Sequence, residues 1–206
     1  MSRRHTFQPS TSRRELLIDC PLDSVNGLLD LISGQYIAGK TAGDVIWDSG
    51  EQAYSFKTQA TSSGNKGVYL TGINLPYPFD WSTYLYGASF DVKRLNNNGG
   101  GFACIAIWWA GQYNRSEAPV YVYYNSGSNE IKLTDTNWHH VEVIWTTTAK
   151  DEYLDGVLHY SEPITSVVWE RRQYIDYTKF LICGAPFSGF NGVAYMKNLT
   201  VWRERL

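Results

Sequence analysis

Residues 137–161 read NWHHVEVIWTTTAKDEYLDGVLHYS and determine how the rest of the chain is interpreted. Within residues 138–147 apolar side chains recur at every second position, so Val141, Val143 and Trp145 lie on one face of an extended strand. Asp155 and Gly156 separate two further strand-like runs, and Asp-Gly is a strong short-range signal for a β-hairpin. The segment therefore predicts a strand followed by a hairpin over residues 152–161.

Strand patterns continue in both directions from this segment, separated by Gly, Asn, Asp and Ser. No segment shows a sustained helical period, although residues 24–32 could form a short helical or looped piece. We expect strands within residues 16–23, 45–50, 53–58, 67–72, 86–95, 102–111, 180–187 and 193–206, and a hairpin over 120–134. Many short strands with frequent turns predict an all-β sandwich or barrel.

Composition supports this fold class. The 206 residues include 15% aromatic and only 18% charged side chains, which favours strands over surface helices. The net charge of −2 gives no indication of nucleic-acid binding. No window is apolar enough over ~20 residues to cross a membrane. We find no linker or repeat, so residues 15–206 are predicted to form one domain behind a basic arm, residues 1–14.

Three segments, in this order, resemble the laminin-G-like domains of the concanavalin A-like class. Residues 16–34 are placed like their opening strand and loop, residues 137–161 resemble their Trp-His-His-Val strand and Asp-Gly hairpin, and residues 190–206 resemble their closing strand. The resemblance covers nearly all of residues 15–206. It implies a jelly roll of two packed antiparallel sheets whose first and last strands are adjacent.

Catalysis is not expected from the sequence. Many jelly-roll relatives are glycoside hydrolases, which need two carboxylates on either side of the sugar. Glu142 has no carboxylate partner on its strand, and Asp155 is explained by its turn. We therefore expect no enzyme activity, with an atypical glycoside hydrolase that uses Glu142 as a remaining alternative.

Cofactors are not expected either. His139 and His140 are adjacent in a strand and point to opposite faces, so they cannot bind one metal ion together. Asp44, Asp48 and Asn191 are oxygen-bearing candidates for a structural calcium ion, but their spacing is not diagnostic. The loop LNNNGGG, residues 95–101, lacks the lysine of a phosphate-binding loop.

The three cysteines, Cys20, Cys104 and Cys183, each lie in an apolar strand context with wide spacing. This pattern predicts buried free thiols and a reducing compartment. The first 15 residues contain no apolar stretch of signal-peptide length, so we expect a product made in the cytoplasm.

Aromatic residues supply the candidate contact surface. Residues 75–87, LPYPFDWSTYLYG, gather Tyr77, Trp81, Tyr84 and Tyr86 in a predicted loop, and Trp109 lies on a strand beside Trp108. Exposed flat rings stack on sugars or anchor protein interfaces. These five rings are therefore the predicted carbohydrate or partner contacts.

The basic arm completes the functional hypothesis. Arg3, Arg4, Arg13 and Arg14 occur without any acidic residue in the first 14 positions, which suggests docking to an acidic partner surface. The first hypothesis is a non-enzymatic bacteriophage virion protein, such as a capsid decoration, head-fibre or tail-associated component. In this hypothesis the arm binds other virion proteins, the chain is present in several copies, and the sandwich contacts neighbouring subunits or host glycans. The alternative is a soluble carbohydrate-binding lectin.

Overall fold

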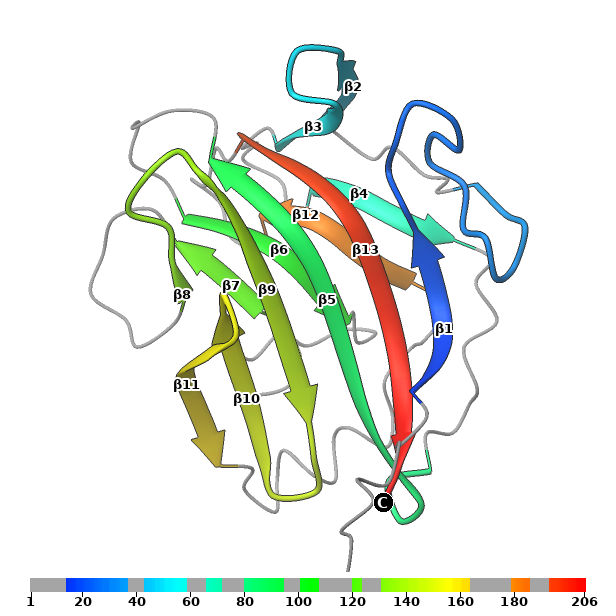
Figure 1. Ribbon diagram of the computed structural model, residues 1–206, viewed down its shortest axis with the longest axis vertical. Coiled ribbons are helices and arrows are strands. Elements are labelled where there is room, and N and C mark those ends of the chain that lie inside the picture. The colour runs from blue at the N-terminus through cyan, green and yellow to red at the C-terminus, as the bar shows by residue number, and fades with distance from the viewer. Residues whose placement is uncertain are drawn as a thin grey trace, which may run out of the picture.

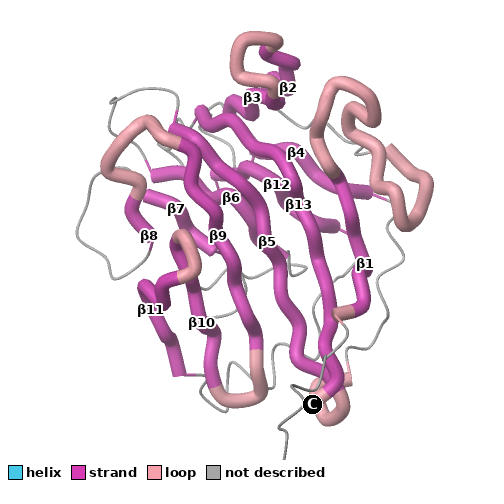
Figure 2. The backbone as a smooth tube through the Cα atoms, in the orientation of Figure 1, coloured by secondary structure: helices cyan, strands magenta, loops and turns pink. Residues whose placement is uncertain are grey.

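A computed structural model of the chain describes residues 14–36, 43–58, 66–71, 80–94, 101–107, 120–123, 131–163, 179–185 and 193–206. All regular structure in this described part is β-strand (Figure 2). Accordingly, it contains no helix that could cross a membrane.

The strands form two sheets that lie one behind the other (Figure 1). The front sheet has eight strands in the order β11-β10-β9-β5-β13-β3-β2, with β1 also paired to β13. Its members are β1 (Glu15–Cys20), β2 (Gly43–Asp48), β3 (Ala53–Thr58), β5 (Tyr84–Arg94), β9 (Trp138–Trp145), β10 (Ala149–Leu154), β11 (Val157–Pro163) and β13 (Val193–Arg205). The all-β antiparallel sandwich is confirmed, and the first and last strands are adjacent as expected.

The rear sheet has five strands in the order β4-β12-β6-β7-β8. These are β4 (Lys66–Thr71), β6 (Gly101–Ile107), β7 (Val120–Tyr123), β8 (Ile131–Lys132) and β12 (Lys179–Ala185). One prediction about this sheet is wrong. β7 and β8 do not form a hairpin over 120–134 but pair in parallel, with Val122 opposite Ile131. The polar stretch between them suggested a turn, but a turn signal does not determine strand direction.

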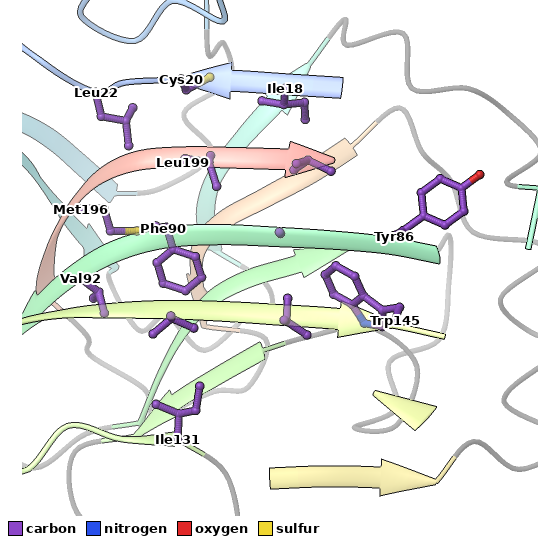
Figure 3. Packing of buried hydrophobic residues seen from close by; sticks show 14 of the residues in the cluster. Ile18, Cys20, Leu22, Tyr86, Phe90, Val92, Ile131, Trp145, Met196 and Leu199 are labelled. Carbon is purple, nitrogen blue, oxygen red and sulfur yellow. The ribbon is translucent and has the colours of Figure 1, made fainter. Parts of the chain in front are cut away.

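The core lies between the sheets and follows the predicted alternation. Val141, Val143 and Trp145 on β9 are all buried, as the sequence indicated. They belong to one core cluster with Phe90 on β5 and Met196 on β13, whose side chains lie next to each other in Figure 3. Because side chains of a strand alternate between faces, the residues between these core positions must point to the opposite side of the front sheet.

Two turns hold this arrangement. The predicted hairpin joins β10 to β11, and both turn residues adopt positive φ, 50° at Asp155 and 79° at Gly156. Residues 24–32 form turns rather than a helix, because the fully buried carboxylate of Asp30 accepts hydrogen bonds from the amides of Asp19, Ile32 and Ser33.

Candidate functional site

The outward side of the front sheet carries an ordered set of polar side chains, which we call the outer face. It is formed by alternate residues of β9, β5 and β13 that the strand register places side by side. In its central row His140 on β9 lies opposite Asp91 on β5, and Asp91 lies opposite Lys197 on β13.

Asp91 organises this central row. Its Oδ1 lies 2.7 Å from Nδ1 of His140, and its Oδ2 accepts a 2.7 Å hydrogen bond from Nδ2 of Asn198. Asn198 has a positive φ of 55° at an irregularity in β13, which brings its amide alongside the aspartate. The His140 side chain is 50% exposed. Within the described residues, Nε2 of His140 and Oδ1 of Asn198 have no protein partner, so both are available to a ligand.

One end of the outer face is aromatic. Trp138 lies opposite Lys93, which in turn lies opposite Tyr195. Nζ of Lys197 is 4.1 Å from the centre of the Trp138 ring. The Tyr195 hydroxyl donates a 2.8 Å hydrogen bond to Asp48, and burial together with this bond raises the pKa of Tyr195 to about 12.

The other end contains an arginine held between two carboxylates. Nη1 of Arg14 lies 2.6 Å from Oε1 of Glu142, and its Nε lies 3.4 Å from Oε2 of Glu204. Its guanidinium carbon is 3.9 Å from the centre of the Trp202 ring. Glu142 has no carboxylate partner on its own strand, but in the structure it forms an ion pair with Arg14, which is always charged.

A histidine bridge lies at the start of β9. Nδ1 of His139 is 2.8 Å from Asp155, and Nε2 is 2.9 Å from Asp135. Burial of the ring lowers the pKa of His139, but the hydrogen bonds to both carboxylates outweigh burial, and the net shift is upward. The bridge fixes the hairpin turn to the loop that precedes β9.

The described part of the chain shows no metal centre, and of the three oxygen-bearing candidates for calcium only the Asp48 side chain is described. No group of three or more His, Cys, Asp or Glu side chains there could hold a metal ion. Asp48 accepts hydrogen bonds from the amides of Gly50 and Glu51 and from Tyr195, so its carboxylate closes a turn. The Asp44 side chain and Asn191 lie outside what the structure describes.

Two of the predicted aromatic contacts are wrong. Trp81 and Tyr86 are only 7% and 3% exposed, and their rings pack edge to face with centroids 4.8 Å apart. Tyr86 lies on the inward side of β5, and Trp81 covers it, so neither ring can meet a partner. Tyr84 is half-buried, with the guanidinium of Arg203 4.5 Å from its ring centre. Tyr77 and Trp109 lie outside the described residues.

The arm is described only at its last residue. Arg14 contacts the outer face, whereas Arg3, Arg4 and Arg13 lie outside the described residues. The central row, formed by His140, Asp91 and Asn198, was missed at the level of sequence. Alternation places Asp91 and His140 on outward strand positions, whereas Asn198 is outward because of the irregularity in β13, and no sequence signal says that these strands are neighbours.

Comparison with known proteins identifies similar folds but no family. No family model matches, and no curated protein matches. Among solved structures, the binding domain of botulinum neurotoxin DC in complex with rat synaptotagmin II is similar over 91% of this chain and 48% of that chain, with 13% identity and a TM-score of 0.56. A botulinum neurotoxin type C structure, described as showing cell entry dependent on two ganglioside molecules, is similar over 92% of this chain and 47% of that chain, with 14% identity and a TM-score of 0.56.

An alginate lyase in complex with dimannuronate is also similar, over 78% of this chain and 77% of that chain, with 11% identity and a TM-score of 0.51. This chain spans about half the length of the neurotoxin domains. At these identities the likeness establishes the β-sandwich fold alone, and the fold hosts both binding domains and an enzyme.

Proposed function

We propose that the chain is a non-catalytic, lectin-like carbohydrate-binding module that uses the outer face of its front sheet. The observation that carries this proposal is the central row of His140, Asp91 and Asn198. Its groups are held by one another and partly exposed, and among the described residues Nε2 of His140 and Oδ1 of Asn198 have no protein partner.

This row has the chemistry that sugar recognition requires. Neighbouring hydroxyls of a sugar both donate and accept hydrogen bonds, and an imidazole nitrogen next to an amide oxygen can satisfy both. Asp91 fixes both side chains before a ligand arrives, so little conformational entropy is lost on binding. Trp138 one row away supplies an aromatic surface beside the polar groups. The similar botulinum neurotoxin and alginate lyase structures, which involve gangliosides and dimannuronate, support a carbohydrate ligand.

We further propose that this module does not hydrolyse sugars. Glycosidases need one carboxylic acid to donate a proton and a second carboxylate on the other side of the bond. Glu142 and Glu204 both contact Arg14, which supports a role for these carboxylates in charge pairing rather than in acid–base chemistry. We expect no release of reducing ends from any polysaccharide by the wild-type protein. Turnover that disappears in Glu142→Gln would establish the hydrolase alternative instead.

A glycan array tests the binding proposal directly. The wild-type protein and His140→Ala are compared, with His159→Ala as the matched control because His159 is an exposed histidine on the edge strand β11. We expect binding that falls at least tenfold in His140→Ala and is unchanged in His159→Ala. An array without signal, or equal binding by all three proteins, would contradict the proposal.

A second function, attachment to a virion through the arm, is favoured by Arg14. Its contacts hold the residue that directly follows residues 1–13 on the outer face. We propose that the other arm arginines, Arg3, Arg4 and Arg13, then bind an acidic groove of a capsid or tail protein, in a multi-copy assembly. Deletion of residues 2–13 should abolish incorporation into particles while the domain still folds, and normal incorporation would refute this role.

A further inference from the structure

Arg14 occupies a site built from three side chains on β9 and β13, the two strands that flank β5 in the front sheet. The indole of Trp202 forms its floor, 3.9 Å from the guanidinium carbon. The carboxylates of Glu142 on β9 and Glu204 on β13 form its two sides. An aromatic floor with two carboxylates recognises a cation by its ring face and by charge-assisted hydrogen bonds.

The floor of this site is preformed by Gly87. Trp202 lies opposite Gly87 in the strand register, on the outer face. A Cβ at Gly87 would lie 2.1 Å from Cζ2 of Trp202, so the indole rests directly on the backbone of β5. The ring cannot move further inward, and a ligand would meet it already in place.

The Arg14 side chain lies over the Trp202 ring and shields it from solvent, and we call Arg14 the cover of this ring. Trp202 is only 2% exposed although it lies on the outer face, with Arg14 against its ring and Leu16 on β1 beside it. Its Nε1 is buried without a hydrogen-bond partner among the described residues. Arg14 itself is 45% exposed, and ion pairs at such exposure contribute little net stability. The cover is therefore weakly held over a rigid floor.

We propose that Trp202, Glu142 and Glu204 form a subsite for a cationic sugar, an unacetylated hexosamine, which Arg14 occupies until such a ligand displaces it. The inference rests on the proposed carbohydrate-binding function and names its ligand class. Sugars stack on aromatic rings through their C–H faces, which suits the indole floor. An ammonium group replaces the charge of the displaced guanidinium.

Other sugars fit this site less well because of the two carboxylates. Both are 21% exposed, so loss of Arg14 leaves two partly desolvated charges without a cation. A neutral or N-acetylated sugar does not compensate them, and an anionic sugar is repelled by them.

Titration calorimetry with a β-1,4-linked glucosamine oligomer tests the proposal. The wild-type protein is compared with Arg14→Ala, and with Arg205→Ala as the control because Arg205 is an exposed arginine at the end of the same strand as Trp202. Because the cover competes with the ligand, Arg14→Ala should bind roughly tenfold more tightly than the wild type. Arg205→Ala should bind like the wild type. Arg14→Ala combined with Glu142→Gln should lose the gain.

The matched N-acetylglucosamine and mannuronate oligomers separate the outcomes. Equal affinity of the wild type and Arg14→Ala for the glucosamine oligomer, or equally tight binding of the N-acetylated oligomer, would overturn the subsite. If neutral sugars bind, and this binding is lost in His140→Ala but unchanged in Arg14→Ala, the subsite would be overturned and the proposed function would remain. Absence of binding by every oligomer and on the glycan array would overturn both. Arg14→Gln provides a second uncovered variant if Arg14→Ala does not unfold cooperatively.

Discussion

Substitution of Gly87 by alanine should destabilise the sandwich more than any ordinary glycine-to-alanine change. The added Cβ would lie 2.1, 2.5 and 2.6 Å from three ring atoms of Trp202. Since carbon atoms pack at about 3.5 Å, the indole would have to move outward by more than about 1 Å. The backbone of β5 cannot yield instead, because β5 is paired on both sides, with β9 and β13.

The magnitude follows from two contributions. Overpacking of a well-packed position by one carbon costs about 1–3 kcal/mol. Outward movement of the indole also displaces the Arg14 guanidinium, and the lost cation–π contact adds about 0.5–1 kcal/mol. We therefore expect Gly87→Ala to lower the free energy of unfolding by about 2–4 kcal/mol, measured by chemical denaturation with an unchanged m-value.

Gly50→Ala is the control for this measurement. Its Cβ would approach only the carboxylate oxygen of Asp48, at 3.3 Å in an exposed turn, so the expected cost is small. In a Trp202→Leu background the ring is absent, and Gly87→Ala should then cost less than about 1 kcal/mol. An equal cost in both backgrounds would show that the ring contact is not the cause, and the packing argument would be refuted.

Three further predictions concern buried or bridged groups. The pKa of His139 is raised in the folded state, so protonated His139 stabilises the fold fully below its ordinary pKa of 6.5. This stabilisation is lost as the pH rises through the folded-state pKa. His139→Gln should therefore flatten the pH dependence of the melting temperature over this range. Lys150→Met should cost about 3–5 kcal/mol in denaturation experiments, because it removes the cation that lies 2.8 Å from the fully buried carboxylate of Glu152. The double variant Lys150→Met with Glu152→Leu should recover most of the loss. Burial raises the pKa of the Cys20 thiol to about 12, so this thiol should react with a thiol-specific reagent only after unfolding, and fast modification of the native protein at Cys20 would contradict its placement.

The sequence predicts those parts of the fold that depend on neighbours along the chain. The alternation of Val141, Val143 and Trp145 is enough to place a strand with one buried face, because the pleat repeats every two residues. Asp155 and Gly156 are enough to place a hairpin, because positive φ at both positions suits few other residues. Both signals act within a few residues, and both predictions are confirmed.

The site depends on contacts between segments that are far apart in the sequence, and no local sequence pattern encodes such contacts. Arg14 and Glu142 are 128 positions apart, and Arg14 and Glu204 are 190 apart. The pairing of β1 with β13, and of β13 and β9 with β5, makes them neighbours. The same limit explains the wrong prediction for Trp81 and Tyr86. Tyr86 is in phase with the inward row of the predicted strand, but no local pattern shows that Trp81 folds over it.

The two sides of the front sheet differ in what their side chains contribute, and this difference supports a binding role for the outer face. Buried inner residues such as Phe90 stabilise the fold through removal of apolar area from water. The outer ion pairs and hydrogen bonds are partly exposed, where each contributes only about 0–1 kcal/mol. The outer face holds two polar clusters within two rows, one around Asp91 and one around Arg14, and short contacts fix the side chains of each. Stability alone does not account for these two clusters. Preorganised polar groups beside an aromatic ring reduce the cost of binding a ligand, which is the benefit that the proposed carbohydrate-binding function would draw from this arrangement.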